Sequence, residues 1–247
     1  MMDLTNLGSQ TAKNGFRNED DIIYKFNNWE TDNEAKLWLE IMQYNLAEIE
    51  FVKAVKLSGF KTDVQVQVTI KLKEAIDSQN IQVKLVSNIK GFNQIDKRWV
   101  NKYVELWNMP KEIENLLKIY TGEIKPNISN PRDKRRMFAD EFSSKNKEII
   151  LKWLNENKSL IVSDILKGRG QFASEWMLVA QKINENARWM LKPINYCLNF
   201  FGNGEISITE RGNFKIGKIT MQRKGSDAGR LTANMLQFKI NPAELFN

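Results

Sequence analysis

The chain has 247 residues, of which 42% are hydrophobic and 27% are charged, as is usual for a globular protein. It contains no histidine, which excludes histidine-based catalysis and histidine-ligated zinc, and its single cysteine, Cys197, excludes an internal disulfide. We find no apolar run of about 18 residues and no basic, apolar leader, so we expect a cytoplasmic protein without a signal peptide or a membrane span.

The net charge of +7 is unevenly distributed along the chain. Residues 1–60 hold six basic and ten acidic side chains, a balance of −4, whereas residues 211–239 hold seven basic side chains and one acidic, a balance of +6. Such a concentration indicates a polyanionic partner, most simply nucleic acid. The alternative is a solvated face, which is the commoner meaning of a charge run.

The first third of the chain predicts two helices followed by strands. Asn18 precedes three acidic residues and predicts a helix start, and residues 32–33 can cap a second helix. Three short segments rich in valine and isoleucine then predict a largely antiparallel meander. These segments are residues 52–57, 64–70 and 81–86.

The rest of the chain alternates helical and strand patterns. We expect a loop at residues 91–98, a helix starting at Asp96 and a basic helix opened by Pro131. Further helices are expected at residues 110–117, 148–154, 161–166 and 194–201, and strands at 176–180, 206–208, 216–222 and 235–240. The order of these helices and strands along the chain predicts an α/β fold, with a mixed central β-sheet and flanking helices. Residues 1–130 would form a catalytic core and residues 131–247 would complete the fold and add DNA contacts, unless the chain is one continuous domain.

The strand at residues 81–86 carries Gln82 and Lys84 side by side on one face. Asp63 begins the preceding strand, and antiparallel neighbours lie about 5 Å apart, so the three side chains can converge. A carboxylate, an amide oxygen and an ammonium group suit a magnesium ion and a phosphate. Asp63 and Gln82 would bind the metal, and Lys84 would face the scissile phosphate.

This pattern resembles the PD-(D/E)xK nuclease superfamily, although Gln82 stands where an acid is usual. A second Q-x-K triplet, Gln237 to Lys239, has only Asp227 nearby upstream, in a glycine-bounded turn, and is discounted as a metal site. Longer blocks narrow the resemblance to type II restriction endonucleases of the HinP type, which cleave the palindrome GCGC and also have glutamine at this position. These blocks are Q-V-K-L-V-S-N-x-K-G-F-N-Q-I-D-K, D-K-R-R-M-F, E-W-M-L-V-A-Q-K and T-A-N-M-L-Q-F-K-I.

The resemblance implies a restriction-endonuclease-like core and Mg²⁺-dependent cleavage of both DNA strands, leaving 5′-phosphate ends. It implies that Gln94 inserts into the DNA stack at the central CpG step. It also implies a partner DNA methyltransferase in the host. A palindromic site suits a homodimer, but a monomer could nick each strand in turn.

Planar amides and guanidinium groups are the side chains that read bases. We therefore expect DNA contacts from Asn93, Gln94, Lys97, Arg135, Arg136, Gln222, Arg223, Lys224, Arg230 and Asn234. Arg135 and Arg136 would contact phosphates. Two rival functions stay open: a structure-specific repair nuclease of the same superfamily, and an inactive DNA-binding protein in which Gln82 marks lost chemistry.

Three features have a simpler structural interpretation. Glu19, Asp20 and Asp21 could supply a metal ligand, but acids near a helix start more often stabilise the helix dipole. The seven tryptophans are expected in the core, and Cys197 is expected to be a buried, inert thiol.

Overall fold

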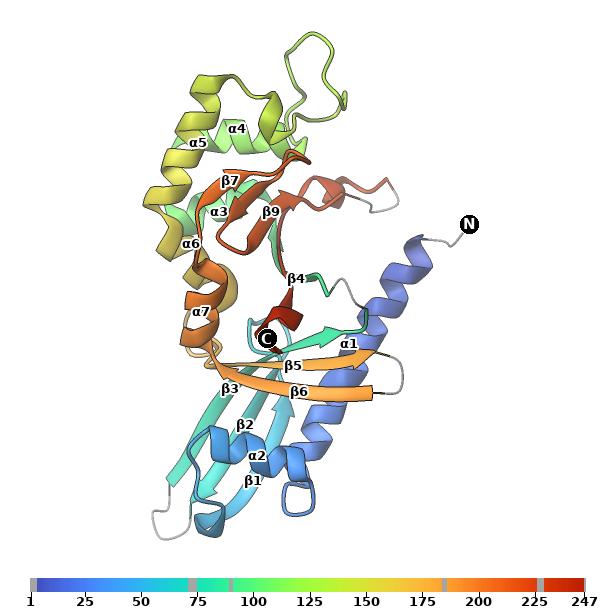
Figure 1. The fold of residues 1–247 in the computed structure, drawn as a ribbon, viewed down its shortest axis with the longest axis vertical. Coiled ribbons are helices and arrows are strands. Elements are labelled where there is room, and N and C mark those ends of the chain that lie inside the picture. The colour runs from blue at the N-terminus through green and yellow to red at the C-terminus, as the bar shows by residue number, and fades with distance from the viewer. Residues whose placement is uncertain (1–3, 71–74, 89–90, 184–185, 226–228, 247) are drawn as a thin grey trace. The chain divides into compact units, whose positions relative to one another are not determined.

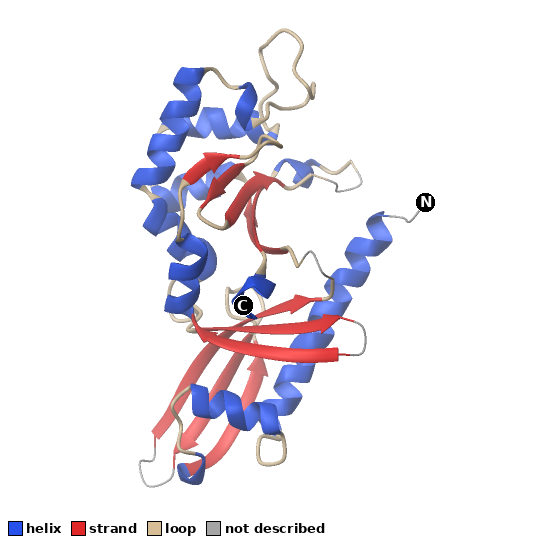
Figure 2. Ribbon diagram, in the orientation of Figure 1, coloured by secondary structure: helices blue, strands red, loops and turns tan. Residues whose placement is uncertain are grey.

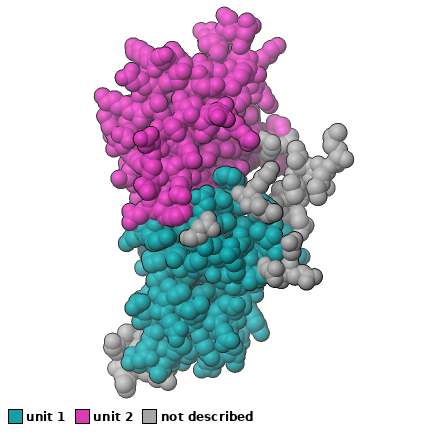
Figure 3. Space-filling model, viewed as in Figure 1, with its two compact units in different colours: residues 1–93, 166–197, 241–247 teal, residues 94–165, 198–240 magenta. Residues whose placement is uncertain are grey.

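A computed structural model describes residues 4–70, 75–88, 91–183, 186–225 and 229–246. Helices and strands divide into two compact units, each with a five-stranded sheet (Figures 2 and 3). Unit 1 contains residues 1–93, 166–197 and 241–247, and unit 2 contains residues 94–165 and 198–240. Compact units are groups of residues that pack together and need not be functional domains, so the division after residue 130 stays a prediction.

The sheet of unit 1 has the strand order β1-β2-β3-β5-β6. Its strands are β1 (Ile49–Lys56), β2 (Val64–Ile70), β3 (Ala75–Val86), β5 (Trp176–Ile183) and β6 (Asn186–Pro193). The β3–β5 pair is parallel and the other pairs are antiparallel, so the sheet is mixed. The predicted meander, β1 to β3, is confirmed, as is the predicted mixed α/β fold.

Helices α1 (Leu4–Asn27) and α2 (Asn33–Ile41) pack on one face of this sheet (Figure 1). Asp32 caps α2, because its Oδ1 accepts a hydrogen bond from the Ala35 backbone N–H at 2.9 Å. The core combines apolar residues of both helices with alternate residues of the strands. Short 3-10 turns at Leu46–Glu48 and Pro242–Phe246 complete the unit.

The sheet of unit 2 has the order β4-β10-β9-β8-β7. Its strands are β4 (Asn93–Arg98), β7 (Ile206–Ile208), β8 (Phe214–Ile216), β9 (Ile219–Arg223) and β10 (Leu236–Ile240). Helices α3 (Val100–Trp107) and α4 (Lys111–Thr121) cover one face, where Phe238 lies 5.5 Å from the ring of Tyr103. The remaining elements are α5 (Ser144–Glu156), α6 (Lys158–Leu166), α7 (Ile194–Gly202) and 3-10 turns at Ala139–Glu141 and Leu231–Asn234.

Two predicted helix starts are wrong. Asn18 lies inside α1, which already begins at Leu4, so the acids after it are not at a helix N-terminus. Asp96 lies in strand β4 rather than in the expected loop, and α3 begins only at Val100. The buried Asp96 carboxylate accepts a 2.6 Å hydrogen bond from the Tyr103 hydroxyl, a tertiary contact that local sequence does not reveal.

The basic helix expected after Pro131 is also wrong. Asp133 Oδ1 accepts hydrogen bonds from the Arg135 backbone and side chain, which closes a turn. Short polar side chains that bond nearby backbone compete with helix formation. Strand β6 was not predicted, because its sequence does not alternate and ends at Pro193. In the described part of the chain, no helix is long and apolar enough to cross a lipid bilayer.

Candidate active site

The register of β2 and β3 brings the predicted catalytic residues together in unit 1. Val64 lies opposite Ile81, so Asp63, one residue earlier, lies opposite Gln82. The backbone N–H of Asp63 donates a 3.0 Å hydrogen bond to the Ile81 carbonyl, which extends the ladder by one step. Directly opposed residues of an antiparallel pair project from the same face, and Lys84 follows Gln82 on that face.

The Asp63 carboxylate is held by two contacts from β3. Its Oδ2 accepts a 2.7 Å hydrogen bond from the backbone N–H of Val83 and lies 3.8 Å from the Lys84 Nζ. Within the described residues its Oδ1 has no hydrogen-bond partner. The side chains of Asp63 and Lys84 are 27% and 12% exposed, so the pair is partly buried but accessible to solvent. The carboxylate is therefore fixed in orientation and keeps one oxygen for a ligand.

Gln82 is 1% exposed, and its Oε1 has no hydrogen-bond partner among the residues that the structure describes. Leaving a buried acceptor unpaired costs about 1–3 kcal/mol. Neutral amide oxygens are ordinary ligands of hard divalent cations, so the donor set of Gln82 and Asp63 fits such an ion. Of the described residues in this unit, Asn18 and Ser174 also have buried atoms without a partner, and nothing in the structure explains them.

The preceding residue on the same face of β3, Asn80, is fully bonded in contrast. Its Nδ2 donates to the carbonyls of Gln171 and Ala173, and its Oδ1 accepts from Gln65. The backbone N–H of Asn80 donates to the Glu175 carboxylate at 2.8 Å. Asn80 and Glu175 thus anchor β3 to the start of β5, and Gln82 is the polar residue left without a protein partner for its oxygen.

Glu19 of α1 is a second acid near this site. Its Oε2 lies 2.9 Å from the Lys56 Nζ, and its charge also interacts with those of Asp63 and Lys84. Burial raises the pKa of the Glu19 carboxyl above its usual value, and repulsion by Asp63 adds to the effect. Asp20 and Asp21 instead pair with Lys56 and Lys182. The helix-dipole interpretation is wrong, because α1 begins at Leu4.

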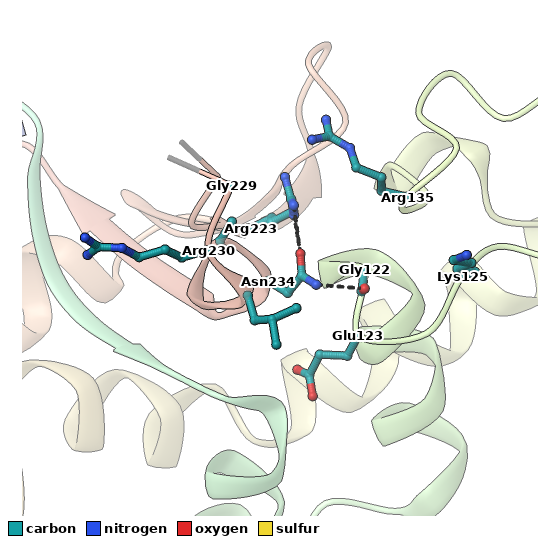
Figure 4. Close-up of a pocket in the computed structure, with 10 residues that line it drawn as sticks. Gly122, Glu123, Lys125, Arg135, Arg223, Gly229, Arg230 and Asn234 are labelled. Atoms are coloured by element: carbon teal, nitrogen blue, oxygen red, sulfur yellow. Dashed lines mark hydrogen bonds between the residues drawn. The ribbon is translucent and has the colours of Figure 1, made fainter. Parts of the chain in front are cut away.

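Four predicted DNA-contact residues, all in unit 2, line one pocket of about 520 Å³ (Figure 4). They are Arg135, Arg223, Arg230 and Asn234. The pocket also contains Lys125, which the sequence did not single out because no basic neighbours flank it. Its excess of positive charge suits an anionic ligand such as a phosphate.

The Arg223 side chain is fixed within this pocket. Its Nη2 donates to the Asn234 Oδ1 at 2.7 Å, and the Asn234 Nδ2 donates to the Gly122 carbonyl at 3.0 Å (Figure 4). Burial lowers the pKa of the Arg223 guanidinium, and the nearby charges of Arg135 and Arg136 lower it further. Cations held together against their mutual repulsion are expected where an anion binds.

The other predicted arginines differ in accessibility. Arg135 is exposed and forms a bidentate pair with Asp133, whereas the Arg136 guanidinium lies 3.8 Å from the Phe138 ring centroid. The Nε and Nη1 atoms of Arg136 are buried and have no hydrogen-bond partner within the described ranges. Arg136 is therefore less available to a phosphate than Arg135.

Six predicted contact residues lie outside this pocket; Arg136 is one of them, and the other five have varied surroundings. Asn93, in unit 1, donates from its Nδ2 to the Gly91 carbonyl at 2.9 Å. Lys97 is exposed and Lys224 is half-buried, both in unit 2. Gln222 donates to Gln237, a buried residue that sequence reasoning assigned no DNA contact.

Gln94 is linked to the same buried residue. It is exposed, and its Oε1 accepts a 2.6 Å hydrogen bond from the Gln237 Nε2. In the sequence, Gln237 stands in the discounted second Q-x-K triplet and in the block T-A-N-M-L-Q-F-K-I.

The comparisons with known proteins agree with this architecture. The model of the R.HinP1I restriction endonuclease family matches residues 42–246. The chain belongs to the R.HinP1I restriction endonuclease family. It is therefore a type II restriction endonuclease, as the sequence predicted.

A solved structure has the same fold as this R.HinP1I-family endonuclease. It is restriction endonuclease MspI in complex with its cognate DNA, with a TM-score of 0.67 and 15% identity, over 96% of this chain and 93% of that chain. At this identity the match concerns the fold, and it confirms the predicted restriction-endonuclease-like core. No curated protein sequence matches the chain.

Restriction endonucleases of this kind generally use divalent metal ions. Among the residues that the structure describes, no three Cys, Asp or Glu side chains converge as a metal-binding group. A site built on Asp63 and Gln82 combines one carboxylate with one amide, so it lies outside that definition. The unpaired Gln82 oxygen beside the oriented Asp63 carboxylate is the feature that fits a bound ion.

Proposed function

We propose that this endonuclease cleaves both strands of the palindrome GCGC in a Mg²⁺-dependent reaction at Asp63, Gln82 and Lys84. The observation that supports the proposal most is the buried, unpaired Oε1 of Gln82 on the same sheet face as Asp63 and Lys84. A nuclease centre needs oxygen ligands and a cation within one small volume, and these three side chains supply them.

Each side chain has a distinct role in this proposal. Asp63 and Gln82 would hold the divalent ion, with Asp63 oriented by the Val83 backbone N–H. The bound ion supplies a nucleophilic water at neutral pH and compensates charge on the phosphate. The Lys84 ammonium, 3.8 Å from Asp63, would orient the attacking water and stabilise negative charge on the phosphoryl oxygens.

Glu19 is the further acid that we propose for the metal-bound state. Its raised pKa reflects burial, and a cation near Asp63 would favour its ionised form. Lys56, at 2.9 Å, balances the Glu19 charge in the protein alone. A neutral Gln82 makes the site less negative than a two-acid centre, so we expect weak metal affinity without DNA, whose phosphate would add a ligand.

The residues that we propose for DNA binding fall into two groups. Arg135, Arg223 and Arg230, with Lys125, would contact phosphates from the pocket in unit 2. Gln94, Gln222 and Asn234 carry amides that can read bases, and Asn93, Lys97, Arg136 and Lys224 complete the proposed contacts. Lysine or arginine to guanine is the commonest base contact, and GCGC offers guanines on both strands.

The specificity, the assembly and the host partner rest on family membership. GCGC is the site expected from the HinP-type resemblance, and a palindrome suits two-fold symmetry, hence the proposed homodimer. A methyltransferase that modifies the same site would protect the host DNA.

A plasmid of known sequence tests the proposal. With Mg²⁺ we expect discrete fragments that map to GCGC, and with EDTA an intact plasmid. A smear of fragments would favour a structure-specific nuclease, and an intact plasmid with a gel shift would favour an inactive DNA-binding protein.

The Lys84→Ala variant tests the site itself. We expect unchanged DNA binding and cleavage at least about 10²-fold slower, as is typical when one electrostatic stabiliser is lost. Lys97→Ala, which changes an exposed lysine outside the proposed centre, is the matched control and should affect binding more than the rate of the bound enzyme. A Lys84→Ala rate close to that of the wild type would remove Lys84 from the mechanism.

A further inference from the structure

The sheet of unit 2 has two chemically different faces. Phe214, Met221 and Phe238 are buried on the face that packs against α3 and α4. The alternate residues of β8 to β10 form the opposite face, and we call it the polar face. It comprises Lys215, Thr220, Gln222, Gln237 and Lys239. The sequence of strands β7 to β10 contains no Asp or Glu, so the polar face combines amide, hydroxyl and ammonium groups only.

Three glutamine side chains form a hydrogen-bonded ladder across this face. Gln222 lies opposite Gln237 in the β9–β10 register, and its Nε2 donates to the Gln237 Oε1 at 3.4 Å. The Gln237 Nε2 donates in turn to the Gln94 Oε1 on β4 at 2.6 Å. Gln237 is 5% exposed, so its amide is committed to these two neighbours.

The two ends of the ladder present opposite hydrogen-bonding groups. Because the Gln94 Oε1 is occupied by Gln237, the exposed end of Gln94 presents its N–H donors. Because the Gln222 Nε2 donates into the ladder, Gln222 presents its carbonyl oxygen. If the Gln237 amide rotated by half a turn, its Nε2 would face the Gln222 Nε2 and its Oε1 would face the Gln94 Oε1. Both contacts would then be unfavourable, so the orientation of Gln237 determines which group Gln94 offers.

Lys239 stands next to Gln237 on the polar face, two residues along β10. It is half-buried, and burial lowers the pKa of its ammonium group. Thr220 lies directly opposite it on β9, and the Asp96 carboxylate of β4, the other neighbouring strand, accepts a hydrogen bond from Tyr103 of α3. A desolvated lysine beside an acid-free row of amides suits a phosphate oxygen.

We propose that Gln237 is a specificity-determining positioning residue, which fixes the Gln94 amide so that its N–H donors meet acceptor atoms of the DNA bases. Lys239 contacts the DNA phosphate backbone next to these bases. This inference rests on the proposed sequence-specific DNA binding. The second Q-x-K triplet, discounted as a metal site, would thus serve recognition.

The test compares Gln237→Glu with the wild type in binding to cognate and non-cognate duplexes, in Ca²⁺ to prevent cleavage. Glutamate keeps the size of the side chain but can only accept, so the Gln94 amide turns and offers its oxygen instead. We expect the ratio of cognate to non-cognate affinity to fall about 5- to 150-fold, which corresponds to the loss of one good base contact. The affinity for the cognate duplex should fall by a larger factor than the affinity for the non-cognate duplex.

Two further measurements separate positioning from simple structural damage. In a Gln94→Ala background, Gln237→Glu should have no further effect on the ratio, because no amide remains to be positioned. Gln237→Met, which has no amide to bond Gln94, covers the case in which the glutamate variant does not fold, and it should also lower the ratio. The control variant Lys239→Gln should leave the ratio unchanged and reduce the slope of log K against log salt by about 1.

The outcomes are distinct. A wild-type protein that does not discriminate between the duplexes contradicts the proposed function itself. A discriminating wild type whose ratio survives both Gln237 substitutions, or falls equally in the Gln94→Ala background, contradicts the role of Gln237 alone. An unchanged salt slope in Lys239→Gln removes Lys239 from the contact surface.

Discussion

Replacing Gln82 by methionine should make the protein more stable and inactive. The Gln82 side chain is 1% exposed and its Oε1 has no partner in the described part of the chain, so the folded protein carries the cost of a desolvated acceptor. Methionine has a similar length and no strong acceptor, and it adapts readily to irregular sites. Removing the unpaired oxygen should therefore raise the free energy of unfolding by about 1–2 kcal/mol. For a chain of this size the melting temperature should rise by about 2–8 °C.

The assay is urea and thermal unfolding in EDTA, paired with plasmid cleavage in Mg²⁺. Cleavage by Gln82→Met should fall at least about 10²-fold, because an oxygen ligand is lost. Asn80→Leu is the matched control on the same strand face, and it should be destabilising by about 2–4 kcal/mol because it unpairs buried carbonyl groups. A Gln82→Met protein that is less stable than the wild type, or that cleaves normally, would refute the assignment of the unpaired oxygen to a ligand site.

Three other predictions follow from the same region and from the core. Gln82→Glu should tighten Mg²⁺ binding by the DNA-free protein, measured by calorimetry, and unchanged affinity would argue against Gln82 as a ligand. The Glu19 carboxyl has a folded-state pKa above 4.5, so the stability that it contributes is present below pH 4.5 and is lost as the pH rises through the folded-state pKa. The wild type should therefore lose stability relative to Glu19→Gln as the pH rises from 4.5 through the folded-state pKa, and saturating Mg²⁺ should reduce the loss. Parallel profiles of stability against pH for the two proteins would contradict this role of Glu19. Burial raises the pKa of the Cys197 thiol to about 12, so it should react with a thiol reagent at pH 8 only after unfolding.

The pairing of Asp63 with Gln82 and Lys84 could be predicted because it is nearly local. Alternating valines define β2, and β3 is the next strand along the chain, so the two strands pair as sequence neighbours. The apolar and polar alternation also fixes which face each residue occupies. The spacing of Gln82 and Lys84 then needs no knowledge of the remaining chain.

The contacts of Glu19 and Gln237 could not be predicted, because each depends on distant segments. Glu19 meets Lys56 only because α1 begins at Leu4 and crosses the sheet, although Gly8 and Gly15 weaken the helical pattern there. The Gln94–Gln237 bond joins residues 143 positions apart, through a β4–β10 pairing that no local pattern specifies. Strand β4 itself has two consecutive buried residues, Ile95 and Asp96, which breaks the alternation that identifies strands.

The two Q-x-K triplets of the chain show how a partner strand decides the chemistry of a motif. Gln82 lies opposite Asp63, so its amide oxygen stands beside a carboxylate, and the pair is suited to hold a cation. Gln237 lies opposite Gln222, so its amide finds complementary donors and acceptors, and the pair is suited to hold an orientation. Each lysine is two residues further along, beside a carboxylate in one case and beside a hydroxyl in the other. Replacing Asp63 by glutamine should therefore abolish cleavage, because the Gln82 oxygen would then stand beside an amide instead of a carboxylate.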